Sequence, residues 1–96
     1  MVKAGAIFSY NSSNNEEKKL CVVTYVQMTV NCAHFSVLFD EGFAQVYSCL
    51  REDVEKDKDV ELLEQELNGK FVSQSSTLIG ALETVFRTGN AVLNEV

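Results

Sequence analysis

The sequence predicts a small α+β domain in which a four-stranded, mainly antiparallel β-meander precedes two C-terminal helices, in the order β-β-β-β-α-α. Three observations favour this class. Apolar and polar residues alternate through much of residues 20–50, turn signals interrupt the alternation twice, and helical spacing replaces it after residue 58. At 96 residues, 46% of them hydrophobic, the chain is expected to form a single domain over residues 1–96 with one modest core.

The first strand is expected over residues 2–10, where Ala4, Ala6 and Phe8 share one face. The segment after it, NSSNNEEKK at residues 11–19, is wholly polar and is interpreted as a hairpin loop. The continuous meander therefore begins at residue 20.

The second strand is expected over residues 20–30, because alternation places six of its residues on one face: Leu20, Val22, Thr24, Val26, Met28 and Val30. Asn31 and Cys32 are interpreted as a two-residue turn, since asparagine tolerates a positive φ. Pairing outward from that turn gives these opposed residues: Met28 and Phe35, Val26 and Val37, Thr24 and Phe39.

Two further strands are expected over residues 33–39 and 43–50, joined by the sequence Asp-Glu-Gly at residues 40–42. This sequence has the pattern of a type I turn with glycine in the left-handed position. Pairing outward from the loop brings Phe39 near Phe43 and Phe35 near Tyr47. The two registers, derived independently, put the same side chains of the middle strand on one face, which supports the meander.

The C-terminal part is expected to be mainly helical. Residues 51–58 are interpreted as a charged connection that includes a first helical turn, and a stripe of Val60, Leu63 and Leu67 predicts a helix over residues 59–67. Residues 70–74 are interpreted as a short extended segment. Ser75 or Ser76 then caps a second helix that ends near Gly89 and carries a stripe of Leu78, Leu82, Val85 and Phe86.

Composition excludes several classes of function. Fourteen acidic residues against eight basic ones give a formal charge of −6, so no direct nucleic-acid partner is expected. No stretch is apolar over the length of a membrane span. Three cysteines, without a CxxC pair, and an N-terminal apolar run broken at Ser9 and Tyr10 favour a reduced cytoplasmic or nuclear protein.

Cys32 and His34 are the residues most suggestive of chemistry, since a thiol and an imidazole could form a nucleophile and its base or two metal ligands. Two positions along a strand separate such side chains by roughly 6.5–7 Å, which is too far for a dyad. The acids of the charged connection alternate with lysines in a segment too polar to bury them: Asp53, Glu55, Asp57 and Asp59. We therefore expect no enzyme activity, no cofactor and no metal.

The second face of the predicted sheet is more apolar than a face turned to water requires. Five of its residues are predicted to form a protein interface, with Tyr25 and Leu38 as anchors: Tyr25, Leu38, His34, Val46 and Val23. The corresponding function is a non-catalytic interaction or assembly subunit, or adaptor, that forms a homo- or heterodimer. A different arrangement, with one helix on each face of the sheet, would cover the same residues internally.

The run FSVLFDEGFAQVYS at residues 35–48, followed by an acidic segment and helices, is similar in outline to the head domains of end-joining scaffold proteins. The likeness covers about half the chain and assigns no functional residue. It implies a second hypothesis, that the chain is the N-terminal head of a longer scaffold protein. A third hypothesis is a small-ligand or metal-binding module that uses the cleft between sheet and helices, with Cys32 and His34 at its rim.

Overall fold

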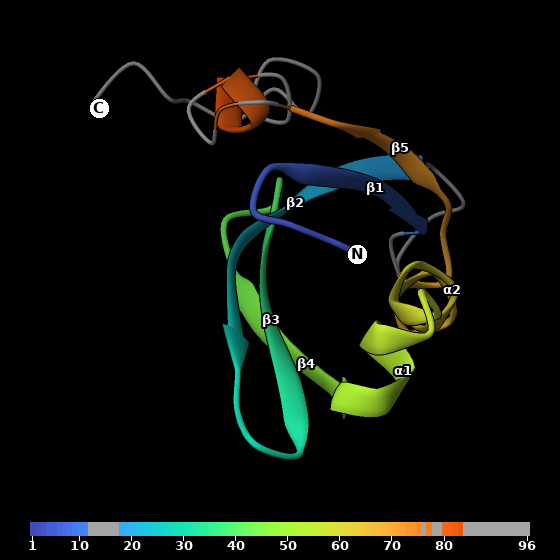
Figure 1. Ribbon diagram of the computed structural model, residues 1–96. Helices are drawn as coiled ribbons and strands as arrows, with labels where there is room; N and C mark the ends of the chain where they lie inside the picture. Colours follow the sequence, from blue (N-terminus) through green and yellow to red (C-terminus); the bar gives the residue numbers. More distant parts are fainter. Residues whose placement is uncertain (12–17, 76, 78–79, 84–96) are drawn as a thin grey trace.

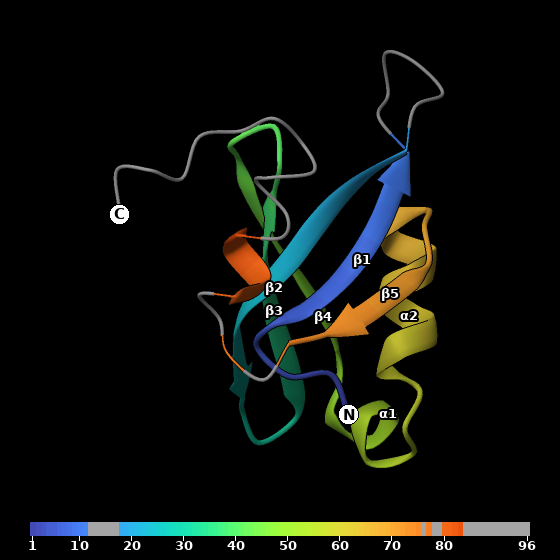
Figure 2. The same ribbon diagram turned by 90° about the horizontal axis from the view of Figure 1, so that it is seen from above.

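The computed structural model describes residues 1–11, 18–75, 77 and 80–83 (Figures 1 and 2). Its elements, in chain order, are β1 (Ala6–Asn11), β2 (Lys18–Met28), β3 (Cys32–Phe39), β4 (Ala44–Leu50), α1 (Arg51–Glu55), α2 (Asp59–Leu67) and β5 (Phe71–Gln74). A helical turn over residues 80–83 follows them. The strands form one antiparallel sheet in the order β4-β3-β2-β1-β5.

The α+β class is confirmed, and the number of strands is corrected from four to five. The additional strand, β5, is the short extended segment predicted at residues 70–74. Asn68 ends α2 in the left-handed conformation with φ 51°, which reverses the chain and returns it along β1. Gly69 makes this return possible because a Cβ at that position would lie 1.6 Å from the carbonyl oxygen of Ser9.

The hairpin between β3 and β4 follows the prediction. Phe35 pairs with Tyr47, and the Phe39 and Phe43 rings stack with their centroids 4.6 Å apart. Gly42 has φ 96°, the left-handed conformation expected of it.

The predicted register between β2 and β3 is wrong by two residues next to their connection. The loop comprises residues 29–31, and Cys32 is the first residue of β3 instead of part of a turn. Met28 consequently pairs with Ala33, and Val26 pairs with Phe35. The hydroxyl of Thr29 stabilises the loop by accepting the backbone N–H of Cys32 at 3.0 Å.

A β-bulge at Thr24 divides β2 into two parts that present opposite alternations. Val23 pairs with Val37, whereas the next pair along the ladder joins Tyr25 to Ser36, so Thr24 has no opposed partner. An inserted residue of this kind moves all later side chains of the strand to the other face. This is why Val23, predicted on the second face, lies in the main core together with Cys21.

The main core occupies the concave face of the curved sheet, the face that α1 and α2 cover (Figure 1). Its buried side chains come from β1, β2, β3, the helices and the N-terminal segment: Val2, Ala6, Phe8, Tyr10, Cys21, Val23, Ala33, Phe35, Val37, Phe39, Val54, Leu63 and Leu67. Val26, Met28, Tyr47, Cys49 and Val60 pack around them. The predicted stripe of α2 therefore faces the sheet.

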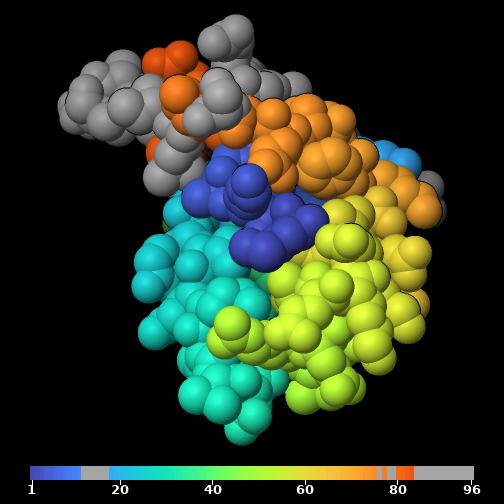
Figure 3. All heavy atoms as spheres, in the orientation of Figure 1, coloured from blue at the N-terminus to red at the C-terminus, as the bar shows by residue number. Residues whose placement is uncertain are grey.

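The charged connection contains more structure than its sequence predicts. Residues 51–55 form α1, whose Val54 is buried, and Asp59 at the start of α2 is fully buried. The Asp59 carboxylate accepts the backbone N–H of Val2, so the N-terminal segment is held against the helices. Figure 3 shows the N-terminal residues (blue) lying against the helical segment (yellow-green).

The second predicted helix is only partly within the described residues. Ser75 Oγ accepts the N–H of Thr77 at 3.2 Å, and Thr77 Oγ1 accepts the N–H of Gly80 at the start of the helical turn. The residues named in this prediction that lie outside the described part of the chain are Ser76, Leu78, Val85, Phe86 and Gly89. Ala81 and Leu82 pack on the convex face of the sheet beside Ile7, Val22 and Leu38.

Candidate interaction surface

The convex face of β2, β3 and β4 has an uncharged centre. The register assigns eleven residues to it: Val22, Tyr25, Gln27, Cys32, His34, Ser36, Leu38, Ala44, Val46, Ser48 and Leu50. None of them is an aspartate, glutamate, lysine or arginine, although the chain carries 22 such residues as the sum of 14 acidic and 8 basic ones. We refer to these eleven residues as the convex face.

Three large side chains of the convex face are exposed. Tyr25, Val46 and Leu50 have 57%, 66% and 51% of their surface accessible. Tyr25 and Val46 flank Ser36 in one row across three strands, because Ser36 pairs with both. Large apolar side chains gathered on an uncharged sheet face are typical of a surface that binds another protein.

The structure brings together four of the five predicted interface residues. Tyr25, His34, Leu38 and Val46 share the convex face, whereas Val23 is fully buried on the concave face as a result of the bulge at Thr24. Leu38 is half-buried because it packs beside Ala81 and Leu82. Of the two predicted anchors, only Tyr25 therefore has a side chain that is exposed to solvent.

His34 and Cys32 lie on the convex face and not at a rim between the sheet and the helices. His34 Nδ1 lies 2.6 Å from Ser48 Oγ on the neighbouring strand. α1 and α2 cover the opposite side of the sheet. The predicted arrangement, in which these two residues border a cleft under the helices, is therefore corrected.

The polar cluster at the β3–β4 hairpin has a structural role. The Tyr10 hydroxyl donates to Asp40 Oδ1 at 2.6 Å and lies 3.1 Å from Glu41 Oε1. Burial, together with the bond to Asp40, raises the pKa of the Tyr10 phenol well above its ordinary value. The hydroxyl thus keeps its proton and joins the hairpin to β1.

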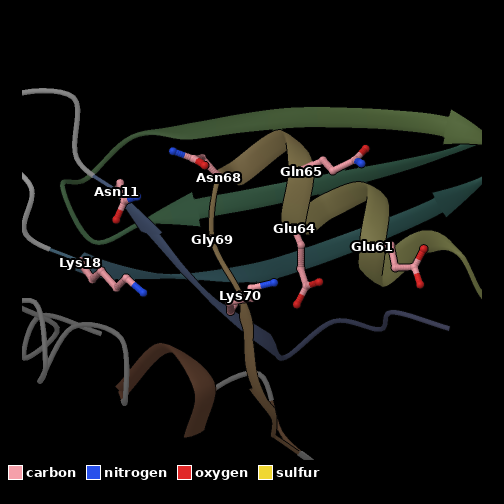
Figure 4. Close-up of a pocket in the computed structure, with 8 residues that line it drawn as sticks. All are labelled: Asn11, Lys18, Glu61, Glu64, Gln65, Asn68, Gly69 and Lys70. Carbon is pink, nitrogen blue, oxygen red and sulfur yellow. The ribbon is translucent and has the colours of Figure 1, made fainter.

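A shallow hollow of about 470 Å³ lies between the C-terminal end of α2 and the ends of β1 and β2. Figure 4 shows that its side chains diverge: Asn68 and Gln65 point away from each other, and Glu61 and Glu64 point toward the lower part of the view. Glu64 also accepts the backbone N–H of Phe71 at 2.9 Å. Side chains that converge on one point are required for a small-ligand site, and this hollow does not have them.

The three cysteines are free thiols. Burial raises the pKa of the Cys21 thiol to about 12, and burial also raises the pKa of Cys49. A nucleophilic cysteine requires the opposite shift. Across the described part of the chain, no three histidine, cysteine, aspartate or glutamate side chains lie close enough to hold a metal ion.

Two features of the surface were missed in the sequence-based selection of interface residues. Leu50 lies at the end of β4 and adds to the exposed apolar area. The alternation of the strand predicts on which face Leu50 lies, but it does not predict that the side chain is exposed. The position of β4 at the sheet edge depends on strand order, which no local pattern encodes. Both features concentrate the exposed apolar surface at the β4 side of the sheet.

Comparison with protein-family models, with curated proteins and with solved structures finds no match for this chain. In the described residues, no helix has the length and apolar character needed to cross a membrane.

Proposed function

We propose that this chain is a non-catalytic interaction or assembly subunit that binds a protein partner, either a second copy or a different protein, through its convex face. The observation that supports this most strongly is the exposure of Tyr25, Val46 and Leu50 at the uncharged centre of this face. Fully burying one leucine or valine side chain contributes about 1.5–3 kcal/mol. A few such residues with an aromatic anchor are enough to form a specific interface.

The non-catalytic part of the proposal is supported by the contacts of the side chains that could carry chemistry. The Tyr10 hydroxyl binds Asp40, and His34 pairs with Ser48. The raised pKa of the Cys21 thiol disfavours the thiolate that nucleophilic catalysis needs. The proposal also includes a cytoplasmic or nuclear location, where free thiols stay reduced.

Site-specific photocrosslinking tests the proposal whatever the identity of the partner. A benzophenone amino acid placed at Tyr25 in the full chain is expected to give crosslinked adducts in cells. The same group at Val72, an exposed valine of β5 at the other edge of the sheet, is the matched control. Adducts at position 25 that are no more abundant than at position 72 would rule out the convex face as the binding surface.

A further inference from the structure

We infer that two copies of this chain pair antiparallel through the edge of β4, about a two-fold axis at Val46, to form one continuous ten-stranded sheet. This inference goes beyond the proposed function, because edge pairing joins two copies side by side and leaves the convex face of each copy open to a partner. The inference rests on the proposed function only in that the convex face and the paired edge both include β4. Three features of the molecule support it: the difference between the two sheet edges, the direction of the β4 backbone groups, and the charges at the ends of the strand.

The two edge strands differ in how they are protected from pairing. β5 has four residues, and its pairing with β1 is interrupted by an irregularity after Ile7. β4 has seven residues, pairs with β3 without a bulge and contains neither a charged residue nor proline in its sequence AQVYSCL. Natural sheets discourage edge pairing by short strands, bulges, charges and proline, and β4 has none of these.

The outward backbone groups of β4 belong to residues whose side chains lie on the convex face. At one end of the β3–β4 ladder Phe39 donates its N–H to Phe43, and at the other Arg51 donates its N–H to Asn31, at 2.8 and 2.9 Å. Hydrogen-bonded pairs alternate along an antiparallel ladder. The N–H and C=O groups that point away from β3 are therefore those of Ala44, Val46, Ser48 and Leu50.

A two-fold axis perpendicular to the sheet keeps the convex faces of both copies on the same side. With the axis at Val46, each Val46 exchanges two hydrogen bonds with its symmetry mate. Ala44 then pairs with Ser48 of the second copy, and both have outward backbone groups. The apolar side chains of two convex faces become contiguous.

The charges at the ends of β4 select this register among those that the backbone allows. Two residues of β4 stand opposite each other when their numbers add to twice 46. Glu41, in the hairpin loop before β4, and Arg51, the first residue of α1 after it, add to the same total. Both side chains are partly exposed, and each has an ion-pair partner within its own chain, Lys19 for Glu41 and Glu55 for Arg51. The pairing therefore places an acid beside a base at each end of the interface, which complements the uncharged strand between them.

Reciprocal charge reversal tests the contact between copies. Sedimentation velocity of the full chain over about 1–200 µM is expected to show a monomer–dimer equilibrium. Glu41→Arg and Arg51→Glu each create two like-charged contacts per dimer, so each variant alone is expected to dimerise roughly tenfold more weakly at low salt. An equal mixture of the two variants restores opposite charges at both ends, and the mixed dimer is expected to regain the wild-type affinity.

Recovery on mixing separates a contact between copies from an effect within one copy, because each chain in the mixture keeps its own altered internal contacts. A wild-type chain that stays monomeric over the whole range, or a mixture that associates no better than the separate variants, would overturn the inference. Adducts at Tyr25 in the photocrosslinking experiment would still support the proposed function in that case. If mixing restores dimerisation but no adducts form at Tyr25, the β4 pairing is supported and the proposed function of the convex face is ruled out.

Discussion

The phenolic hydroxyl of Tyr10 donates a 2.6 Å hydrogen bond to the buried Asp40 carboxylate, which joins β1 to the hairpin between β3 and β4. The other Asp40 oxygen, Oδ2, is also buried and has no hydrogen-bond partner. A buried carboxylate with so few partners depends strongly on the one donor it has. The Tyr10 hydroxyl therefore helps to position the hairpin that leads into β4, together with the hydrogen bond that the Asp40 backbone N–H donates to the Leu20 carbonyl oxygen.

Tyr10→Phe is expected to lower the free energy of unfolding by about 1–3 kcal/mol, because Asp40 loses its hydroxyl donor while the ring packing is kept. Urea unfolding of the variant and the wild type measures the difference. In a double-mutant cycle with Asp40→Ala, the two losses are expected to be less than additive. Fully additive losses would show that the two side chains act separately.

Alkaline pH is expected to destabilise the protein through Tyr10 and Cys21. The pKa of both groups is raised in the folded state, to about 12 for Cys21, because burial disfavours the charged form. The folded state therefore holds these protons more tightly than the unfolded state. Their contribution to stability is complete below about pH 9 and falls as the pH rises toward 12, by up to about 1.4 kcal/mol per pH unit for each group.

Unfolding experiments between pH 8 and 11 measure this slope. Cys21→Ala is expected to lower the stability at neutral pH, since it removes a buried side chain, and to make the alkaline loss less steep. If the unfolding free energy of the variant falls with pH as steeply as that of the wild type, ionisation of Cys21 does not contribute to the alkaline loss of stability.

Gly69→Ala is expected to be severely destabilising, because its Cβ would lie 1.6 Å from the Ser9 carbonyl oxygen and would push β1 away from the chain that leads into β5. Gly42→Ala is the control. It has open space around it and only the strain of a positive φ, which costs about 1–3 kcal/mol. Thermal unfolding measures the loss of stability in each variant. Equal losses of stability in the two variants would contradict the close approach of Gly69 to β1.

Amide hydrogen exchange is expected to depend on protein concentration at three positions in β4. The N–H groups of Ala44, Val46 and Ser48 point away from β3, so they should exchange quickly in the monomer and slowly in the dimer. Tyr47, whose N–H points toward β3, should be protected at all concentrations. Exchange at Val46 that is the same at about 5 and 200 µM, measured by nuclear magnetic resonance, would argue against edge pairing.

Local patterns in the sequence predicted the α+β class, the β3–β4 hairpin and helix α2. Phe35 pairs with Tyr47 as expected, and the helix occupies residues 59–67 because Leu63 and Leu67 share its buried stripe. Gly42 takes the left-handed conformation that its loop requires. These features are determined by neighbouring residues, so periodicity and turn chemistry are enough to find them.

The features that were not predicted depend on contacts between distant residues. Nothing near Thr24 distinguishes a bulge from continued alternation, so the alternation predicts the wrong face for Val23. Asp59 lies in a charged run, but it is buried because the backbone N–H of Val2 binds it from 57 positions away. The two sheet edges likewise follow from the pairing of β1 with β5, which involves residues far apart in the sequence.

Val46 belongs both to the convex face and to the proposed two-fold axis, so its substitution by serine tests the central claim most directly. Val46→Ser and Val72→Ser make the same chemical change on exposed valines of the two edge strands. Native mass spectrometry of the full chain purified from cells that express it measures the outcome. The wild type and Val72→Ser are expected in a complex heavier than the 10.7 kDa monomer, and Val46→Ser is expected as the monomer. A monomeric wild type, or a Val46→Ser variant in the same complex as the wild type, would contradict the account.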